Sequence, residues 1–310
     1  MTTTERPEIS VIIPCLNEEA NAAAIAQAVI DEVTKETQSY ELLFIDNSST
    51  DATVAIIKGL CAQNPRIRLI VNNKNYGQMR SPTYGIYQTR GAAVIGICAD
   101  FQDPPQMIGA FIRRWRAGAH IVLGVRETEN SSLAVSVLRS LGYDLLSRFG
   151  DYPIVRGATG FGLYSREVVD CLSAWNEPQP FFRGMLVESG FRLETIPYHR
   201  PRRQRGFSKN NLLTSADFAL AALSASSKNW LRLPIYLSLV LFSVGALGLA
   251  AALIGLAFGQ APWTALLLSA AVFGFAGLFF FLGLIGDQVR LISERTRNVP
   301  LVVEKERVNF

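Results

Sequence analysis

Residues 92–105 read AAVIGICADFQDPP, a short apolar run that breaks directly into a polar turn ending in two prolines. An apolar run of about seven residues, bounded by Gly91 and by the proline pair, is typical of a fully buried strand of a parallel sheet rather than of a helix. In open α/β sheets such strands deliver ligands at their carboxyl ends, which is where Asp100, Gln102 and Asp103 fall. The stretch therefore predicts an α/β fold with a functional site at one edge of the sheet.

The preceding sequence extends this pattern. Short β-branched runs alternate with amphipathic helical patterns, which predicts a parallel sheet with crossover helices. After Arg126 longer helical patterns and less regular strands, ending near residues 191–197, predict a second half of the same globular domain. We expect strands at 9–13, 41–45, 67–71, 92–98 and 120–125, and helices from about 18 to 35, up to about 62 and up to about 89.

Two long segments near the carboxyl end, Leu233–Phe258 and Ala261–Gly286, contain no charged residue. Each run is about 25 residues long, enough to cross the ~30 Å hydrocarbon core of a bilayer. We therefore predict a two-helix transmembrane hairpin. A buried helical hairpin in a soluble core is the alternative, but core helices of this length normally show a polar stripe, and neither run has one.

Positive charge predicts the orientation of the hairpin. Lysine and arginine residues flank both spans, whereas the connector at 259–262 has none. The first residues also lack the apolar core of a signal peptide. We expect an integral protein of the inner (cytoplasmic) membrane, with both termini and the amino-terminal domain in the cytoplasm. The expected parts are this domain at 1–208, an amphipathic juxtamembrane segment at 209–232, the hairpin at 233–286 and a tail at 287–310.

Composition narrows the chemistry further. The net charge of +4 is modest, and four scattered cysteines, in a cytoplasmic domain, predict neither disulfides nor a zinc site. Positive charge is concentrated in the short segment 200–209. The plainer explanation of this segment is a solvated or lipid-headgroup-binding charge run.

Polar residues also follow the first two strands. Pro14–Glu19 comes after the first and Asp46-Asn47 after the second, and in a parallel sheet both lie on the edge that carries Asp100. Helix capping by Asn17 and Glu18, or an Asx turn at Asp46, is the plainer explanation of each segment alone. An oxygen-rich cluster of this kind suits a hard cation, Mg²⁺ or Mn²⁺, that would neutralise a leaving diphosphate.

Together these segments resemble family 2 glycosyltransferases, specifically the polyprenyl-phosphate glycosyltransferases such as dolichol-phosphate mannosyltransferase and bactoprenol glucosyltransferase. The likeness covers nearly the whole chain. It is carried by residues 12–19, 45–51, 99–105, 124–126, Arg183-Gly184, Gly206–Lys209 and the hairpin.

The resemblance implies a GT-A fold, a Rossmann-like α/β domain with a mostly parallel sheet, followed by the juxtamembrane segment and the hairpin. It implies that the metal is held by Asp100 and Gln102, which would act in catalysis beside Arg126, Thr159 and Arg183. The acceptor phosphate would be received by Arg203 and Lys209. The nucleotide sugar would be bound by Pro14, Asn17, Glu18, Asp46 and Gly77.

Three departures from the family pattern stand out. Many relatives have an acidic residue where Cys98 stands, and their usual Asp-Gly-Ser is Asn47-Ser48-Ser49 here. Many also carry an Asp before the phenylalanine that corresponds to Phe161, whereas this chain reads Thr159-Gly160 at that place. The missing Asp does not exclude transfer, because a phosphate monoester with a second pKa of about 6 is already largely anionic.

The sequence thus predicts an enzyme that transfers a sugar from a UDP- or GDP-linked donor to a polyprenyl phosphate at the cytoplasmic face of the membrane, in cell envelope glycan synthesis. The sugar and the base remain open. A membrane glycosyltransferase with another lipid or polysaccharide acceptor, or an inactive membrane scaffold, are the alternatives. The expected partners are the donor, the lipid acceptor, the bilayer and a second copy of the chain, but no nucleic acid.

Overall fold

The computed structural model describes residues 6–127, 155, 157–199, 201, scattered positions between 271 and 296, and 299–310. Within these residues the chain forms an eight-stranded sheet in the order β7-β5-β6-β4-β1-β2-β3-β8. The strands are β1 (Ile9–Cys15), β2 (Tyr40–Asp46), β3 (Ile67–Asn72), β4 (Ala93–Gly96), β5 (Ile121–Arg126), β6 (Ala158–Ser165), β7 (Leu193–Tyr198) and β8 (Glu304–Val308).

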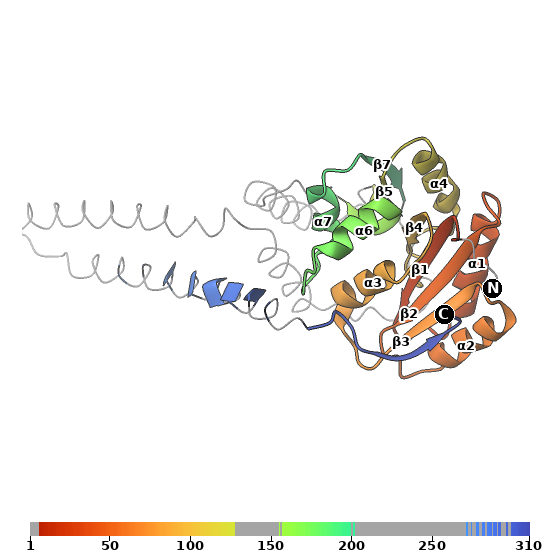
Figure 1. Cartoon of the computed structure of the whole chain (residues 1–310), viewed down its shortest axis with the longest axis horizontal. Helices are drawn as coiled ribbons and strands as arrows, with labels where there is room; N and C mark the ends of the chain where they lie inside the picture. Colours follow the sequence, from red (N-terminus) through yellow and green to blue (C-terminus); the bar gives the residue numbers. More distant parts are fainter. Residues whose placement is uncertain are drawn as a thin grey trace, which may run out of the picture.

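Helices cover both faces of this sheet (Figure 1). One face packs against α1 (Ala22–Val33), α2 (Thr53–Gln63) and α4 (Ile108–Arg116). The other packs against α3 (Gly77–Tyr87), α6 (Arg166–Ala174) and α7 (Phe182–Glu188). Alternate residues of the central strands enter the two cores: Val11 and Ile13 lie on the first face, and Ile12 lies on the second. A strand buried on both faces must be apolar throughout, which explains the continuous runs in the sequence.

The sheet is mostly parallel, as expected. Pairings of β1 with β2 and β4, of β2 with β3 and of β5 with β7 are parallel. Only β6 and β8 introduce antiparallel pairs, with β4, β5 and β3. This three-layer arrangement confirms the Rossmann-like α/β prediction. The strand expected at 92–98 is shorter in the structure, where β4 covers Ala93–Gly96. Ile97 N still donates to Ile12 O, but the chain turns away after that bond.

The predicted membrane hairpin is not tested by this structure. The first span, 233–258, lies outside the described residues, as do the juxtamembrane segment 209–232 and all but scattered positions of the second span. Across the part of the chain that is described, no helix has the length and apolarity needed to cross a bilayer. The segment predicted as a tail, 287–310, contains β8, which pairs with β3 and so forms part of the sheet.

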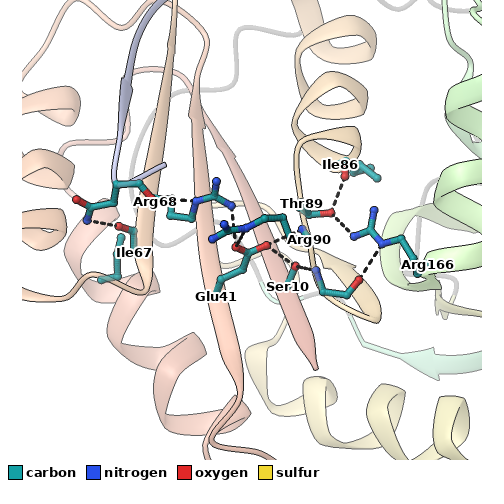
Figure 2. A network of polar contacts seen from close by, with 10 residues as sticks. Ser10, Glu41, Ile67, Arg68, Ile86, Thr89, Arg90 and Arg166 are labelled. Atoms are coloured by element: carbon teal, nitrogen blue, oxygen red, sulfur yellow. Dashed lines mark hydrogen bonds and ion pairs between the residues drawn. The ribbon is translucent and has the colours of Figure 1, made fainter. Parts of the chain in front are cut away.

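A buried polar network lies where the central strands begin, at the edge opposite their carboxyl ends (Figure 2). Glu41 at the start of β2 accepts hydrogen bonds from Ser10 Oγ (2.7 Å) and Arg90 N (2.8 Å). It also pairs with Arg68 Nη1 at 2.7 Å, and the two side chains are only 3% and 4% exposed. Ser10 Oγ in turn accepts from Gly91 N at 2.7 Å. The network ties the starts of β1, β2 and β3 to the segment that leads into β4.

Candidate active site

The loops that follow β1, β2 and β4 leave the sheet at the same edge, as the sequence predicts. Cys15 at the end of β1 is opposite Asp46 at the end of β2, and Ile12 is opposite Gly96 at the end of β4. β6 runs antiparallel to β4, with Gly162 opposite Gly96, so the first residues of β6 reach this edge as well. The polar segments predicted to converge are therefore brought together.

The loop after β1 interlocks with the loop after β2. Asn17 has a positive φ of 56°, and its backbone N donates to Ser49 Oγ at 2.8 Å. In return Thr50 N donates to Asn17 Oδ1 at 2.8 Å, and Glu18 N donates to Thr53 Oγ1 at 2.8 Å. Asn17 therefore holds the two loops together. Pro14 lies within β1, directly opposite Ile45 of β2.

Asp46 is fully buried at the end of β2. Its Oδ2 accepts from Ser49 N, three residues further on, at 2.9 Å, whereas the Asx turn considered as the plainer explanation would bond to the residue two positions on. Burial, followed by the negative charge of Asp46, raises the pKa of the neighbouring Cys15 thiol well above its ordinary value. Cys15 thus stays a neutral thiol beside the Asp46 carboxyl group.

Asn47 uses every hydrogen-bonding position of its side chain. Its Oδ1 accepts from Asn72 Nδ2 (3.1 Å) and from Tyr76 N (2.8 Å), and its Nδ2 donates to Asn75 Oδ1 (2.8 Å) and to Gly77 O (3.3 Å). The next residue, Ser48, has a φ of 68°, a conformation that glycine adopts more easily. Ser48 therefore adopts a left-handed conformation at the position where the family pattern has glycine.

The turn after β4 presents Asp100 and Gln102. Asp100 Oδ1 accepts from Gln102 N at 3.1 Å, and Phe101 between them has a φ of 57°. Both side chains are half-buried. A carboxylate and an amide oxygen on one tight turn fit a hard cation that completes its shell with water and substrate phosphates. Among the described residues there is no group of three or more His, Cys, Asp or Glu side chains that could hold a metal ion.

Asp103, at the end of this turn, holds the turn in place through two hydrogen bonds of its buried side chain. It is only 3% exposed, and its two carboxylate oxygens accept from Cys98 N (3.2 Å) and from the Tyr198 hydroxyl (3.1 Å). Burial raises the pKa of Asp103, although these hydrogen bonds and the Arg126 charge act in the opposite direction. Asp103 thus anchors Cys98 and the turn, and the two ligands that we predicted, Asp100 and Gln102, remain the candidates for the metal.

Two arginines lie around the start of β6. Arg126, at the end of β5, donates through Nε to the Tyr198 hydroxyl at 3.4 Å. Arg183 donates through Nη1 to Ala158 O at 3.0 Å. Thr159 Oγ1 is buried close to the Tyr198 hydroxyl, but without the geometry of a hydrogen bond. Arg126, Thr159 and Arg183 therefore belong to one region of the edge, whereas Arg203 and Lys209 lie outside the described residues.

Sequence reasoning missed two parts of this site. Tyr198 is the last residue of β7 and bonds to Asp103 across 95 positions of sequence, which no local pattern indicates. The Asn47 cross-link was also missed, because it depends on four partners that only the folded chain brings to the end of β2. The sequence Asn75-Tyr76-Gly77 was the only local indication of a tight loop at this place, and Gly77 does have a positive φ of 79°.

Comparisons with known proteins agree with the family resemblance seen in the sequence. The chain matches the model of glycosyl transferase family 2 over residues 10–173, which is more than half of its length. It is 27% identical over 300 residues to the uncharacterized glycosyltransferase YkcC of Bacillus subtilis, covering 96% of this chain and 93% of that protein. It is 28% identical over 304 residues to a bactoprenol glucosyl transferase of Shigella phage SfX, covering 97% and 99%.

Among solved structures, it is similar to a mannosyltransferase from Pyrobaculum calidifontis in complex with GDP-mannose and Mn²⁺. The identity is 19%, the TM-score is 0.43, and the match covers 95% of this chain and 88% of that one.

Proposed function

The chain belongs to glycosyl transferase family 2, and from this membership we propose that it moves a sugar from a UDP- or GDP-linked donor to polyprenyl phosphate. The observation that carries the proposal is the convergence of the Asp46 loop and the Asp100 turn at one sheet edge. Near full-length similarity to bactoprenol glucosyl transferases supports the choice of acceptor. We place the reaction at the cytoplasmic face, with the domain at 1–208 anchored by the hairpin at 233–286.

In this proposal each part of the edge has a role. Pro14, Asn17, Glu18, Asp46 and Gly77 shape the pocket for the nucleoside. The Asp100 and Gln102 oxygens would hold Mg²⁺ or Mn²⁺, which when bound neutralises charge on the nucleoside diphosphate. Arg126 and Arg183 lie where an anionic substrate would be oriented, and guanidinium groups suit phosphate oxygens.

The acceptor supplies its own nucleophile. An oxygen of the lipid phosphate attacks the anomeric carbon of the donor, the new C–O bond forms, and the bond to the nucleoside diphosphate breaks. No strong base is needed, because the second pKa of a phosphate monoester is about 6. Thr159-Gly160, which stands where many relatives have an acid before the phenylalanine, is compatible with this reaction. Arg203 and Lys209 would hold the lipid phosphate.

A panel of UDP- and GDP-sugars, tested with one short polyprenyl phosphate in the presence and absence of Mn²⁺, examines the proposal. We expect transfer from one donor, only with the metal. Transfer to a polysaccharide or another lipid, uninhibited by added polyprenyl phosphate, would assign a different acceptor. Metal-dependent nucleotide binding with no transfer to any acceptor would identify a scaffold, which the departures at Cys98 and Thr159-Gly160 would then explain.

Arg203→Ala and Lys209→Ala are expected to raise KM for the lipid phosphate by about tenfold each, because a charge-assisted phosphate contact contributes about 1.5–3 kcal/mol. The donor KM should stay unchanged. Lys58→Ala, on the outer face of α2 in an exposed pair with Glu306, is the matched control. An unchanged KM for the lipid phosphate in both variants would contradict an acceptor role for this basic segment.

Metal affinity is expected to depend on the nucleotide. Two protein oxygens form an incomplete shell for a hard cation, so the diphosphate must supply further ligands. Calorimetric titration of Mn²⁺ should show weak binding to the protein alone and at least tenfold tighter binding with UDP or GDP present. Tight binding of Mn²⁺ to the protein without nucleotide would count against the Asp100 and Gln102 assignment.

A further inference from the structure

The carboxyl-terminal segment returns to the catalytic domain beside the candidate donor site. β8 pairs antiparallel with β3, from Leu69 opposite Val308 to Asn72 opposite Glu304 (Figure 1). The residues just before β8 therefore lie next to the loop that follows β3. This loop, Asn73–Gly77, ends at the glycine predicted to bind the nucleotide and leads into α3. Two segments more than 220 positions apart in sequence thus meet at the functional edge.

Tyr76 joins the two segments. Asn73 N donates to Val303 O at 3.1 Å, and Val303 N donates to the Tyr76 hydroxyl at 3.1 Å. The same hydroxyl donates to Asn73 Oδ1 at 2.8 Å. A single phenolic oxygen therefore closes the Asn73–Gly77 loop on itself and attaches it to the carboxyl-terminal segment.

Arg80, in the first turn of α3, makes a second attachment. Its Nε donates to Leu301 O at 2.9 Å and its Nη2 donates to Pro300 O at 2.8 Å. Its guanidinium carbon also lies 5.2 Å from the centre of the Tyr76 ring, within the range of a cation–π contact. The planar guanidinium group thus bridges two backbone carbonyls of the carboxyl-terminal segment and the ring of the loop.

The opposite side of the loop is held by Asn47. Its four side-chain hydrogen bonds connect the end of β2 with Asn72, Asn75, Tyr76 and Gly77. The loop therefore has two supports: Asn47 at the end of β2, and residues 299–304 just before and at the start of β8. Local sequence could fix neither support, since Asn73–Gly77 contains two asparagines and a glycine that favour several turn conformations.

We propose that residues 299–304 are a part of the donor site, which position the Asn73–Gly77 loop for the nucleotide through Tyr76 and Arg80. The proposal rests on the function proposed above and adds positioning residues that lie beyond the predicted membrane hairpin in sequence. Its consequence is that the domain at 1–208 is incomplete by itself. The donor loop has both of its supports only when residues 299–304, which follow the predicted hairpin in sequence, are present.

The test compares Tyr76→Phe with the wild-type full-length chain. Loss of the hydroxyl removes the bond from Val303 N and the bond to Asn73 Oδ1, and a typical hydrogen bond contributes about 1 kcal/mol, which corresponds to about fivefold. We expect amide hydrogen exchange within 73–77 to be at least fivefold faster and the donor KM to rise about fivefold. kcat and the KM for the lipid phosphate should not change. A general loss of folded protein would instead lower the apparent kcat and leave the donor KM unchanged.

Arg80→Gln provides an independent variant with the same expected pattern. Lys58→Met is the matched control, because it also removes a contact with the carboxyl-terminal segment, the pair with Glu306, which lies within β8 and outside residues 299–304. It should leave exchange in 73–77 and the donor KM unchanged. Unchanged loop exchange in both Tyr76→Phe and Arg80→Gln would overturn the proposal, and so would faster exchange with an unchanged donor KM.

Failure of the proposed function gives a different result. In that case the wild-type chain transfers no sugar in the donor panel, and the Kd of UDP or GDP with Mn²⁺ takes the place of KM. Faster loop exchange together with a weaker nucleotide Kd in Tyr76→Phe would still support positioning. Exchange or affinity equal to the wild type would overturn it.

Discussion

Asp100→Asn is expected to lower kcat/KM for sugar transfer by ~10³-fold, because a metal ion that stabilises developing charge contributes several kcal/mol and each 1.36 kcal/mol is tenfold in rate. The substitution removes the negative charge but retains Oδ1, which can still accept the 3.1 Å hydrogen bond from Gln102 N. The turn should therefore keep its shape. Steady-state transfer at several Mn²⁺ concentrations is the measurement, and the apparent Mn²⁺ affinity should fall in parallel.

Asp31→Asn is the matched control for this prediction. Asp31 is exposed on α1 and accepts a hydrogen bond from Gln27 Nε2 that asparagine can also accept. The control should transfer sugar at the wild-type rate, and both variants should melt at the wild-type temperature. Activity of Asp100→Asn within tenfold of the wild type, together with an unchanged apparent Mn²⁺ affinity, would show that the metal is held elsewhere.

The central fold was predictable because its signals are local. β1, β2 and β3 are apolar runs between helical patterns, and the structure places them within two residues of the expected ends. β8 had no such signal. Its sequence, Glu-Lys-Glu-Arg-Val, is polar because it forms an edge of the sheet, and four of its five residues are charged. Only its pairing with β3, together with contacts such as Tyr84 to Glu304 (2.8 Å), stabilises it there.

The site was predictable to the same extent. The carboxyl ends of parallel strands meet by topology, so Asp46 and Asp100 could be brought together from sequence alone. The bond from Tyr198 to Asp103 and the attachment of Tyr76 to Val303 depend on contacts between distant segments, which spacing does not encode. These contacts hold the site in place, whereas the residues proposed to meet substrate lie near the ends of strands and helices and in the loops between them.

Glu41→Leu is expected to destabilise the catalytic domain by about 3–5 kcal/mol, because it leaves the Arg68 guanidinium buried without its partner. Ser10 Oγ and Arg90 N lose their acceptor at the same time (Figure 2). Denaturant unfolding of the full-length chain in detergent measures the loss. The double variant Glu41→Leu/Arg68→Met, which removes both charges, should recover part of it.

Glu306→Ala is the control for the ion pair, since its partner Lys58 is exposed and such pairs contribute about 0–1 kcal/mol. A loss below about 1 kcal/mol in Glu41→Leu, equal to that of Glu306→Ala, would contradict the importance assigned to the buried network.

The same network predicts how stability depends on pH. Burial alone would raise the pKa of Glu41, but hydrogen bonds from Ser10 and Arg90 N and the charge of Arg68 outweigh it and lower this pKa below its ordinary value. A carboxyl group with a lowered folded-state pKa adds stability that is complete above the unfolded-state pKa, about 4.3, and is lost as the pH falls toward the folded-state value.

Glu41→Gln cannot ionise, so it should lose less stability than the wild type as the pH is lowered from about 6 to about 3.5. Unfolding titrations at several pH values would give the two slopes, and equal slopes would mean that Glu41 does not ionise differently in the folded and unfolded chain. A shallower slope in the variant would instead show that the charge of Glu41, beyond its packing, joins the starts of β1, β2 and β3.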